Sequence, residues 1–209
     1  MIGSGNVGLV VSYQILQAAG EVVSVVEGAP SISGYMVHAN KLIRAGVPIY
    51  TSHTIKEAIG ESRVEHVVIV EVGPGFVPIE GTEKMLSADT VCLAVGLNPS
   101  VELARLAGCR TMYVPGLGGR LIAHNDEMMT SVEGIYAAGD ASGVEEASTA
   151  MEEGRLAGLS IARSLNLVDD AEWKTAAAEI TKRIGELRSG CHGEQRRKNK
   201  ELIIKEYTA

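Results

Sequence analysis

The sequence predicts an α/β protein with a Rossmann-like parallel sheet, and three observations support this fold class. A G-x-G-x-x-G turn stands at residues 3–8 and leads directly into a helical pattern. Short aliphatic runs then alternate with further helical segments, and aromatic residues make up only 4% of the 209 residues. Because parallel strands are covered by helices on both faces, such Val-, Ile- and Leu-rich runs are typical of them.

The glycine turn itself is predicted to bind a dinucleotide. Gly3, Gly5 and Gly8 suit a tight turn, close approach of a pyrophosphate, and close packing of the following helix, in that order. Asn6 and Val7 lie between these glycines and are included in the candidate site. The flanking elements favour this interpretation over a chance glycine-rich turn.

Glu27 is the predicted ribose contact of the same site. Gly20 ends the first helix, and the apolar run 22–26 is predicted to be a buried strand that leads to Glu27, nineteen residues after Gly8. A carboxylate at this point of a β-α-β unit binds a ribose 2′-hydroxyl and repels a 2′-phosphate. No arginine lies in the following residues 28–30, so the sequence favours NAD over NADP.

The next segments are predicted to complete this domain. Residues 33–45 have a helical pattern, and a strand is expected over 47–51. The runs 54–58 and 64–72 have the character of strands, with Gly73-Pro74-Gly75 as a turn.

A second candidate ligand site follows a predicted buried strand over 135–138. Gly139 has no side chain where a backbone must approach a ligand, and Asp140 offers a carboxylate to ribityl or ribose hydroxyls. A helix predicted over 145–165 directs its positive end to the same place. Taken alone, Gly-Asp would fit a plain strand and turn equally well.

The remaining elements are a short helix over 101–107, a strand over 110–114 and a C-terminal helix. Asp169 and Asp170 are predicted to start that last helix by capping, and it extends to about Arg188. A charged tail follows, and its basic run 196–200 is expected to form a solvated helix face. Docking of the tail to a partner subunit is the alternative.

Three stretches of sequence resemble the pyridine nucleotide-disulfide oxidoreductase superfamily. The run TSVEGIYAAGDAS at 130–142 resembles its second FAD-contacting motif, and residues 41–50 resemble the helix and third strand of its NADH domain. Residues 143–147 (GVEEA) and 153–158 (EGRLAG) are similar to the flavoprotein subunits related to the sarcosine oxidase α subunit, opine oxidase and hydrogen cyanide synthase.

The resemblance implies three regions. Residues 1–95 would be an NAD(H)-binding domain with a β-meander, residues 96–167 the C-terminal part of an FAD-binding domain, and residues 168–209 a helical, charged tail. The segment 87–99 resembles the strand, over the apolar run 90–95, and the turn where the chain leaves the NADH domain. Gly96 would then lie near the bound nucleotide, although it equally suits a simple turn before Asn98-Pro99.

Two departures from the family pattern affect the expected activity. Val10 stands where many NADH-linked members have a glutamate that helps to hold the nicotinamide. The family's FAD-binding glycine turn, which lies far upstream of the NAD turn, is not in this sequence, and only Met1 and Ile2 precede Gly3. The first strand is therefore truncated, and we expect a partner subunit or a second copy to supply what is missing.

The resemblance implies an oxidoreductase that moves hydride or electrons between NAD(H) or an amine-type small-molecule substrate and FAD. FAD binding requires that the other half of its site be supplied. The alternative is a non-catalytic nucleotide-binding or assembly module that keeps the fold without flavin. No catalytic residue is assigned, and His124 in a loop is expected to be incidental.

Composition excludes several other classes. Cys92, Cys109 and Cys191 show no C-x-x-C spacing, which argues against dithiol chemistry, and Cys191-His192 is weak evidence for a metal, so no metal site is predicted. The net charge of -7 argues against nucleic acid as a partner. No apolar run reaches the ~18 residues of a membrane span, and no leader is seen, so a cytoplasmic protein is expected.

Overall fold

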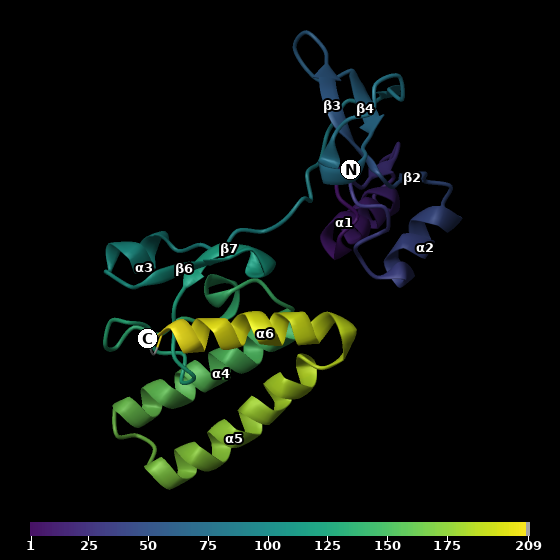
Figure 1. Cartoon of the computed structure of the whole chain (residues 1–209). Coiled ribbons are helices and arrows are strands. Elements are labelled where there is room, and N and C mark those ends of the chain that lie inside the picture. Colours follow the sequence, from purple (N-terminus) through teal and green to yellow (C-terminus); the bar gives the residue numbers. More distant parts are fainter. Residues whose placement is uncertain (208–209) are drawn as a thin grey trace. The chain divides into compact units, whose positions relative to one another are not determined.

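The computed structural model describes residues 1–207, without the side chains of residues 191, 192 and 206. The chain divides into two compact units, Met1–Val95 and Gly96–Ala209, and each is described by itself. Figure 1 shows helices and strands in both units, and the predicted α/β class is confirmed.

The first unit begins with a small parallel sheet covered by two helices. Helix α1 (Asn6–Gln17) follows the glycine turn, and β1 (Val25–Val26) pairs in parallel with β2 (Ile49–Tyr50). Helix α2 (Met36–Arg44) connects these two strands. Ile2 forms parallel bridges with both Val26 and Leu93, so the segment Met1–Ile2 lies between two neighbouring extended segments of the same sheet.

A three-stranded antiparallel meander completes this unit. Strands β3 (His53–Ile59), β4 (His66–Glu71) and β5 (Lys84–Ser87) pair in sequence order. The short helix η1 (Pro74–Phe76) lies in the connection after β4, where the sequence predicts a turn. The two strand-like runs predicted at 54–58 and 64–72 are therefore confirmed, with boundaries shifted by one or two residues.

The two faces of the parallel sheet are buried by different elements. On one face, Leu9 and Leu42 of the helices pack with Val25 and Val47. On the other face, Ile2 and Val26 pack against residues of the meander, among them Val67 and Ile69. The sheet is thus covered on both sides by aliphatic side chains, as its composition indicates.

The second unit combines a β-hairpin with helices. Helix α3 (Glu102–Leu106) precedes β6 (Thr111–Val114), which pairs antiparallel with β7 (Gly119–Ile122) across the short helix η2 (Pro115–Leu117). The short helix η3 (Gly139–Ser142) holds the Gly-Asp motif and leads to α4 (Ala147–Ser164).

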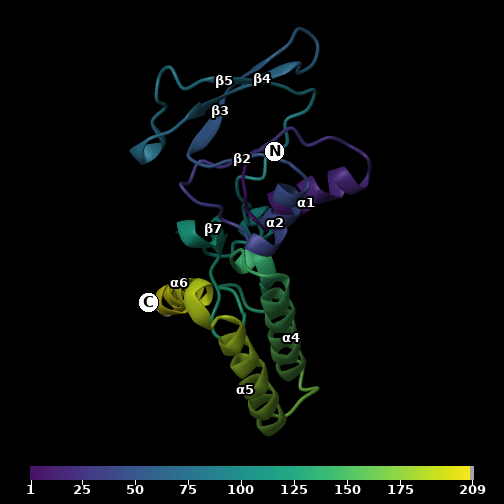
Figure 2. The same cartoon turned by 90° about the vertical axis from the view of Figure 1, so that its right-hand side faces the viewer.

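Two long helices, α5 (Asp170–Leu187) and α6 (Gly190–Tyr207), follow α4. Helices α4 and α5 lie side by side as a helical hairpin (Figure 2), with Leu156, Ile180 and Ile184 in their shared core. Asp169 caps α5 by accepting hydrogen bonds from the amides of Ala171 and Glu172, which confirms the predicted helix start. None of the helices within residues 1–207 is long and apolar enough to cross a membrane.

Several predicted strands are shorter than expected or not formed. The run 22–26 pairs only at Val25–Val26 and the run 47–51 only at Ile49–Tyr50. Residues 90–95 make a single bridge at Leu93, and the strand predicted at 135–138 makes a single antiparallel bridge between Tyr136 and Met129. An extended segment becomes a strand only where a neighbouring strand continues the ladder of hydrogen bonds. Among the described residues, the strands that neighbour these segments are short.

The C-terminal tail is also different from its prediction. Helix α6 packs on the β-hairpin of β6 and β7 through Ile203, which is fully buried beside Leu117 and Leu121. Asn199 and Lys200, expected on a solvated face, are buried. Cys92 is partly buried, and Cys109 is buried.

Candidate functional site

The glycine turn at the start of the chain is tightly packed at two of its three glycines. Gly3 has a φ of +102°, and a Cβ atom there would lie 2.2 Å from the carbonyl oxygen of Ala94. A Cβ atom on Gly8 would lie 2.2 Å from the carbonyl oxygen of Gly3. Both positions therefore require glycine for the packing of the helix against the sheet.

Gly5 differs from these two because no atom lies near its absent side chain. A Cβ atom there would meet nothing within 4 Å, and the φ of −63° is open to any residue. Gly5 is the N-cap of α1 but supplies no capping side chain. The amides of Asn6, Val7 and Gly8 have no hydrogen-bond partner within the described residues, so this helix start is a ready anion site.

Glu27 is held beside this turn by a set of donors. One carboxylate oxygen accepts from the Ser4 amide at 3.0 Å and from the hydroxyls of Ser4 and Ser33. The other accepts from the Ala29 amide at 2.9 Å. Burial alone would raise the pKa of Glu27, but these hydrogen bonds outweigh it and the pKa is lowered. The carboxylate is therefore charged and fixed in direction.

Sequence patterns did not reveal the residues that hold Glu27 and the loop before α2. Ser4 Oγ also accepts from the Ser33 amide at 3.0 Å, and Asn6 Oδ1 accepts from the Tyr35 amide at 2.8 Å. These contacts join the glycine turn to the loop before α2. The serines themselves, Ser4 within the glycine turn and Ser33 in the loop before α2, were the available signal in the sequence. Small hydroxyl side chains commonly form hydrogen bonds to nearby backbone.

In the second unit, the Gly-Asp motif lies on η3 and not at the end of a regular strand. Gly139 has a φ of +71°, in the left-handed region that favours glycine. Its amide donates to Glu153 Oε2 at 2.9 Å. Asp140 is exposed, and its carboxylate has no hydrogen bond or ion pair in the part of the chain that the structure describes. It is thus free to accept from a ligand's hydroxyls.

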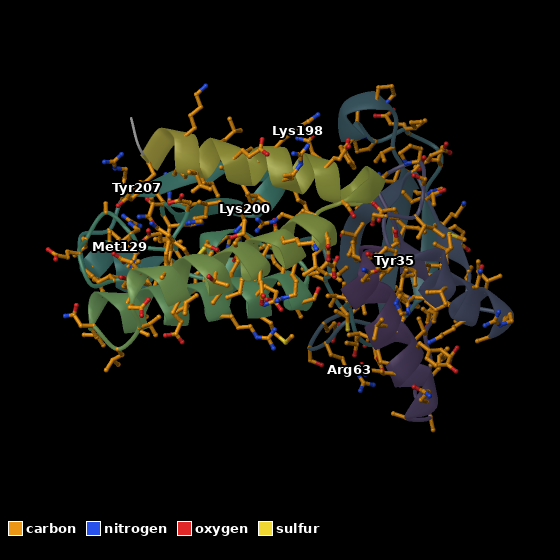
Figure 3. All side chains as sticks on the ribbon, turned by 90° about the horizontal axis from the view of Figure 1, so that it is seen from below. Tyr35, Arg63, Met129, Lys198, Lys200 and Tyr207 are labelled. Carbon is orange, nitrogen blue, oxygen red and sulfur yellow. The ribbon has the colours of Figure 1, made fainter. Side chains whose placement is uncertain are left out.

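A buried charge cluster, formed by Glu153, Lys200, Arg188 and Ser142, lies behind this motif. The Lys200 ammonium donates to Glu153 Oε1 at 2.7 Å and to the carbonyl and hydroxyl oxygens of Ser142. Arg188 donates to the same Glu153 oxygen at 2.6 Å. Figure 3 shows Lys200 on the inner side of α6, facing the other helices of its unit. The cluster therefore ties α6 and the C-terminal end of α5 to α4 and η3.

The cluster sets the ionisation of Glu153. Burial by itself raises the pKa of this carboxyl, but the charge and hydrogen bond of Lys200, together with Arg188 and the Gly139 amide, lower it below its usual value. Both Glu153 and Lys200 have side chains only 4% exposed. This explains why Lys200 is not on a solvated face: its ammonium has a carboxylate partner inside the unit.

His124, expected to be incidental, is buried in the same unit. Its Nδ1 bonds to the carbonyl oxygen of Asn125 at 2.8 Å, while its Nε2 has no partner among the described residues. Burial lowers the pKa of His124, and the hydrogen bond to Asn125 offsets this only in part. The imidazole is therefore neutral, with Nδ1 as the donor to the carbonyl.

We expect the second unit to lose stability as the pH falls from 7. The unfolded His124 has a pKa of about 6.5, and the folded value is lower, so the unfolded state binds more protons below that pH. Glu153 acts in the same direction below a pH of about 4.3, because its folded pKa is also lowered. Urea unfolding followed by the fluorescence of Trp173, the single tryptophan, measures the effect at pH 7 and 5.5.

His124→Asn is the matched variant for this pH effect. Asparagine retains an amide donor for the Asn125 carbonyl but does not titrate in this range. The decrease in unfolding free energy between pH 7 and 5.5 should be smaller in the variant. An equal decrease in both proteins would assign the effect to other groups.

The structure provides fewer contacts for the other candidate positions. Gly96 is exposed, has a φ of +133° and begins the second unit, so its predicted place near a nucleotide stays a prediction. Val10 is a partly buried residue of α1. Within the described residues, no group of three or more His, Cys, Asp or Glu side chains could hold a metal, and the side chains of Cys191 and His192 lie outside those described.

The parallel sheet, the open glycine turn and the oriented acid together define a dinucleotide-binding protein of the α/β class. Comparison with known proteins identifies the group within this class. Residues 1–154 match the pyridine nucleotide-disulphide oxidoreductase family, and the chain belongs to that family. Its members are oxidoreductases that depend on FAD and NAD(P)H.

Individual relatives agree with this assignment. An NADH oxidase of Methanocaldococcus jannaschii is 28% identical over 92% of this chain and 42% of its own length. One of the opine oxidase subunits of Rhizobium meliloti is 38% identical over 71% of this chain and 32% of its own length. The chain thus spans less than half the length of these curated relatives.

A similar fold is present in a solved structure. The crystal structure of the T. acidophilum thioredoxin reductase aligns with a TM-score of 0.66 and 23% identity, over 78% of this chain and 51% of that one. At this level of identity the likeness concerns the fold alone. It agrees with the α/β architecture of both units.

Proposed function

We propose that this chain provides the NAD(H)-binding unit and one part of the FAD-binding unit of an oxidoreductase that moves hydride between a nicotinamide and a flavin. The observation that carries the proposal is the Glu27 carboxylate, fixed beside the open start of α1 by the Ser4 and Ala29 amides. A ribose hydroxyl and a pyrophosphate could be bound there together.

The proposed preference for NADH over NADPH follows from charge. Glu27 is ionised, and a 2′-phosphate beside it would be repelled. The Ala29 amide and the serine hydroxyls already bonded to Glu27 keep the carboxylate in place in the free protein, so little ordering is needed when a ribose binds.

For FAD, the residues present fit one side of a site. Asp140 offers an unpaired, exposed carboxylate for the ribityl hydroxyls, and Gly139 leaves room for a close approach of the backbone. A bound flavin would supply the hydride chemistry, while the protein binds and orients it. We propose that further residues, from a partner subunit or a second copy, complete the FAD site.

The proposed substrate is a small molecule, either NADH itself or an amine-type compound whose hydride passes to the flavin. The likeness to an opine oxidase subunit supports the second of these. A non-catalytic nucleotide-binding role is the second candidate function. The observation in its favour is Val10, because an apolar side chain on α1 makes no polar contact to a nicotinamide.

Titration of the purified chain with NADH and NADPH, followed by nucleotide fluorescence, tests the proposal. We expect saturable binding of NADH and at least about tenfold weaker binding of NADPH, which corresponds to about 1.4 kcal/mol. Equal affinities, or no binding of either nucleotide, would contradict the proposed site. Addition of FAD and an artificial electron acceptor then separates the two candidate functions. NADH oxidation supports the oxidoreductase. Tight NADH binding without oxidation and without flavin binding supports the non-catalytic nucleotide-binding role.

A further inference from the structure

The single phenylalanine of the chain, Phe76, lies in the connection after β4 and is 64% exposed. Val77 and Ile79 in the same connection are exposed as well. The hydrophobic effect favours burial of a ring of this size, and aromatic residues make up only 4% of this chain. An aromatic side chain that the core does not use is therefore presented at the surface together with two aliphatic ones.

Backbone hydrogen bonds hold Phe76 in a tight turn. The Gly73 amide donates to the Val77 carbonyl at 2.9 Å, and the Phe76 amide donates to the Gly73 carbonyl at 3.1 Å. Gly75 and Phe76 have φ values of +72° and +60°, both in the left-handed region. This region is unfavourable for a large side chain, and residues held in it cluster at ligand-binding sites. The conformation of Phe76 thus indicates a constraint other than local preference.

The phenyl ring lies against the backbone of Gly28. A Cβ atom on Gly28 would lie 2.5 Å from Cε1 and 3.0 Å from Cδ1 of Phe76. The φ of Gly28 is outside the left-handed region, so glycine is required at this position by the ring and not by the backbone. One side of the ring is thus fixed on Gly28, while most of the side chain stays open to solvent.

This contact lies beside Glu27, at the carboxyl ends of the two parallel strands. The Glu27 amide donates to the Tyr50 carbonyl at 2.8 Å, at the end of β2. In the turn that follows β2, the Ser52 carbonyl accepts from the Val72 amide at 2.7 Å. The residues that follow β1, β2 and β4 are thus joined by hydrogen bonds at the edge where parallel sheets bind their ligands.

The group that Phe76 would contact follows from the chemistry of a nucleoside. We place the ribose 2′-hydroxyl on Glu27, and in a nucleoside the base is attached to the next carbon atom of the sugar. A ribose held by Glu27 therefore brings its base close to Gly28, the residue on which the ring lies. A phenyl ring has no hydrogen-bonding group, so it contributes to binding by stacking on the flat face of the base.

We propose that Phe76 positions the adenine ring of the bound nucleotide by stacking on it. The inference rests on the proposed NAD(H) site and adds a contact from the meander, outside the β-α-β unit of the glycine turn and Glu27. Because the turn and Gly28 fix the ring before the nucleotide arrives, little side-chain freedom is lost on binding. Stacking does not read the edge of the base, so a dinucleotide with hypoxanthine in place of adenine should bind nearly as well.

ADP-ribose, which carries the adenine nucleoside without the nicotinamide, is the probe. Phe76→Leu keeps an apolar side chain but removes the ring, and it should weaken ADP-ribose about tenfold, within the usual cost of losing an aromatic ring stacked on a base. Phe76→Tyr keeps the ring and should bind as the unaltered chain does. Val77→Ala, which removes an exposed apolar side chain from the same turn, is the matched control and should have no effect. Isothermal titration calorimetry measures these affinities.

The outcomes separate the role of Phe76 from the site as a whole. Equal affinity of Phe76→Leu and the unaltered chain would overturn the role of Phe76 but leave the nucleotide site in place. Tighter binding by Phe76→Leu would also overturn it, because the ring would then cover the site and not support the base. No binding of ADP-ribose or NADH to the unaltered chain would overturn the proposed NAD(H) site itself, and this inference with it.

Proton NMR of the ligand distinguishes stacking from a structural effect of the ring. The adenine H2 and H8 signals of ADP-ribose should shift upfield on binding, because these protons would lie over the face of an aromatic ring. This shift should be largely lost in Phe76→Leu and kept in Phe76→Tyr. An upfield shift that persists in Phe76→Leu would overturn the assignment.

Gly28→Ala tests the contact without altering the ring. The added Cβ atom would displace Phe76, so both the affinity for ADP-ribose and the upfield shift should decrease. Combined with Phe76→Leu, the same change should cost little more, because the ring that it displaces is already gone. Equal losses with and without the ring would show that the contact between Gly28 and Phe76 has no part in binding and would overturn the proposal.

Discussion

Replacement of Lys200 by methionine is expected to lower the unfolding free energy of the second unit by about 3 kcal/mol, the low end of the usual cost of breaking a buried ion pair, because Arg188 still pairs with Glu153. Its ammonium is bonded to Glu153 and to two oxygens of Ser142, and its side chain is 4% exposed. Urea unfolding followed by Trp173 fluorescence reports on this unit, because Trp173 lies in α5.

Lys198→Met is the matched control, since it removes the same charge from an exposed position on the same helix. This control should change the unfolding free energy by no more than about 0.5 kcal/mol. The double variant Glu153→Gln with Lys200→Met should lose less than the sum of the two single variants, because the paired charges are removed together. Equal stability of Lys200→Met and Lys198→Met would show that the buried pair does not form in solution.

The second large effect is expected on nucleotide binding. Gly5→Ala should weaken NADH binding at least about tenfold, because the added methyl group occupies the open space in which we place the pyrophosphate. The free protein has room for that methyl group and a suitable φ, so its fold should be little changed. NADH fluorescence measures the affinity, and circular dichroism during unfolding measures the stability.

Two other glycines provide the comparison. Gly8→Ala should disturb both folding and binding, because its Cβ atom would meet the Gly3 carbonyl. Gly185→Ala, in the open on α5, should leave NADH binding unchanged and raise stability by about 0.5–1 kcal/mol. If Gly5→Ala binds NADH as the unaltered chain does, the pyrophosphate does not lie at this turn.

Local sequence signals predicted the helices well. The glycine turn predicts the start of α1, Gly20 its end, and Asp169 the start of α5, because caps and glycines act through residues close in the chain. Two of the three strands of the meander were also predicted from local apolar runs and a turn, whereas β5 was not. Glu27 could be placed at the end of β1 from spacing alone.

Long-range pairing accounts for what was not predicted. The aliphatic run 135–138 has the composition of a buried strand, but it has one bridging residue, Met129, among the described residues. In the same way, the run 196–200 has the composition of a solvated helix face. Lys200 is buried because Glu153, far away in the sequence, neutralises it.

The sequence by itself determined the family, the α/β class and the positions of the glycine turn, Glu27 and the Gly-Asp motif, because these depend on residue type and on short spacings along the chain. Only the tertiary structure decided which donors hold Glu27 and which carboxylate holds Gly139. Hydrogen bonds and ion pairs between distant segments depend on three-dimensional packing, and no local pattern encodes that packing.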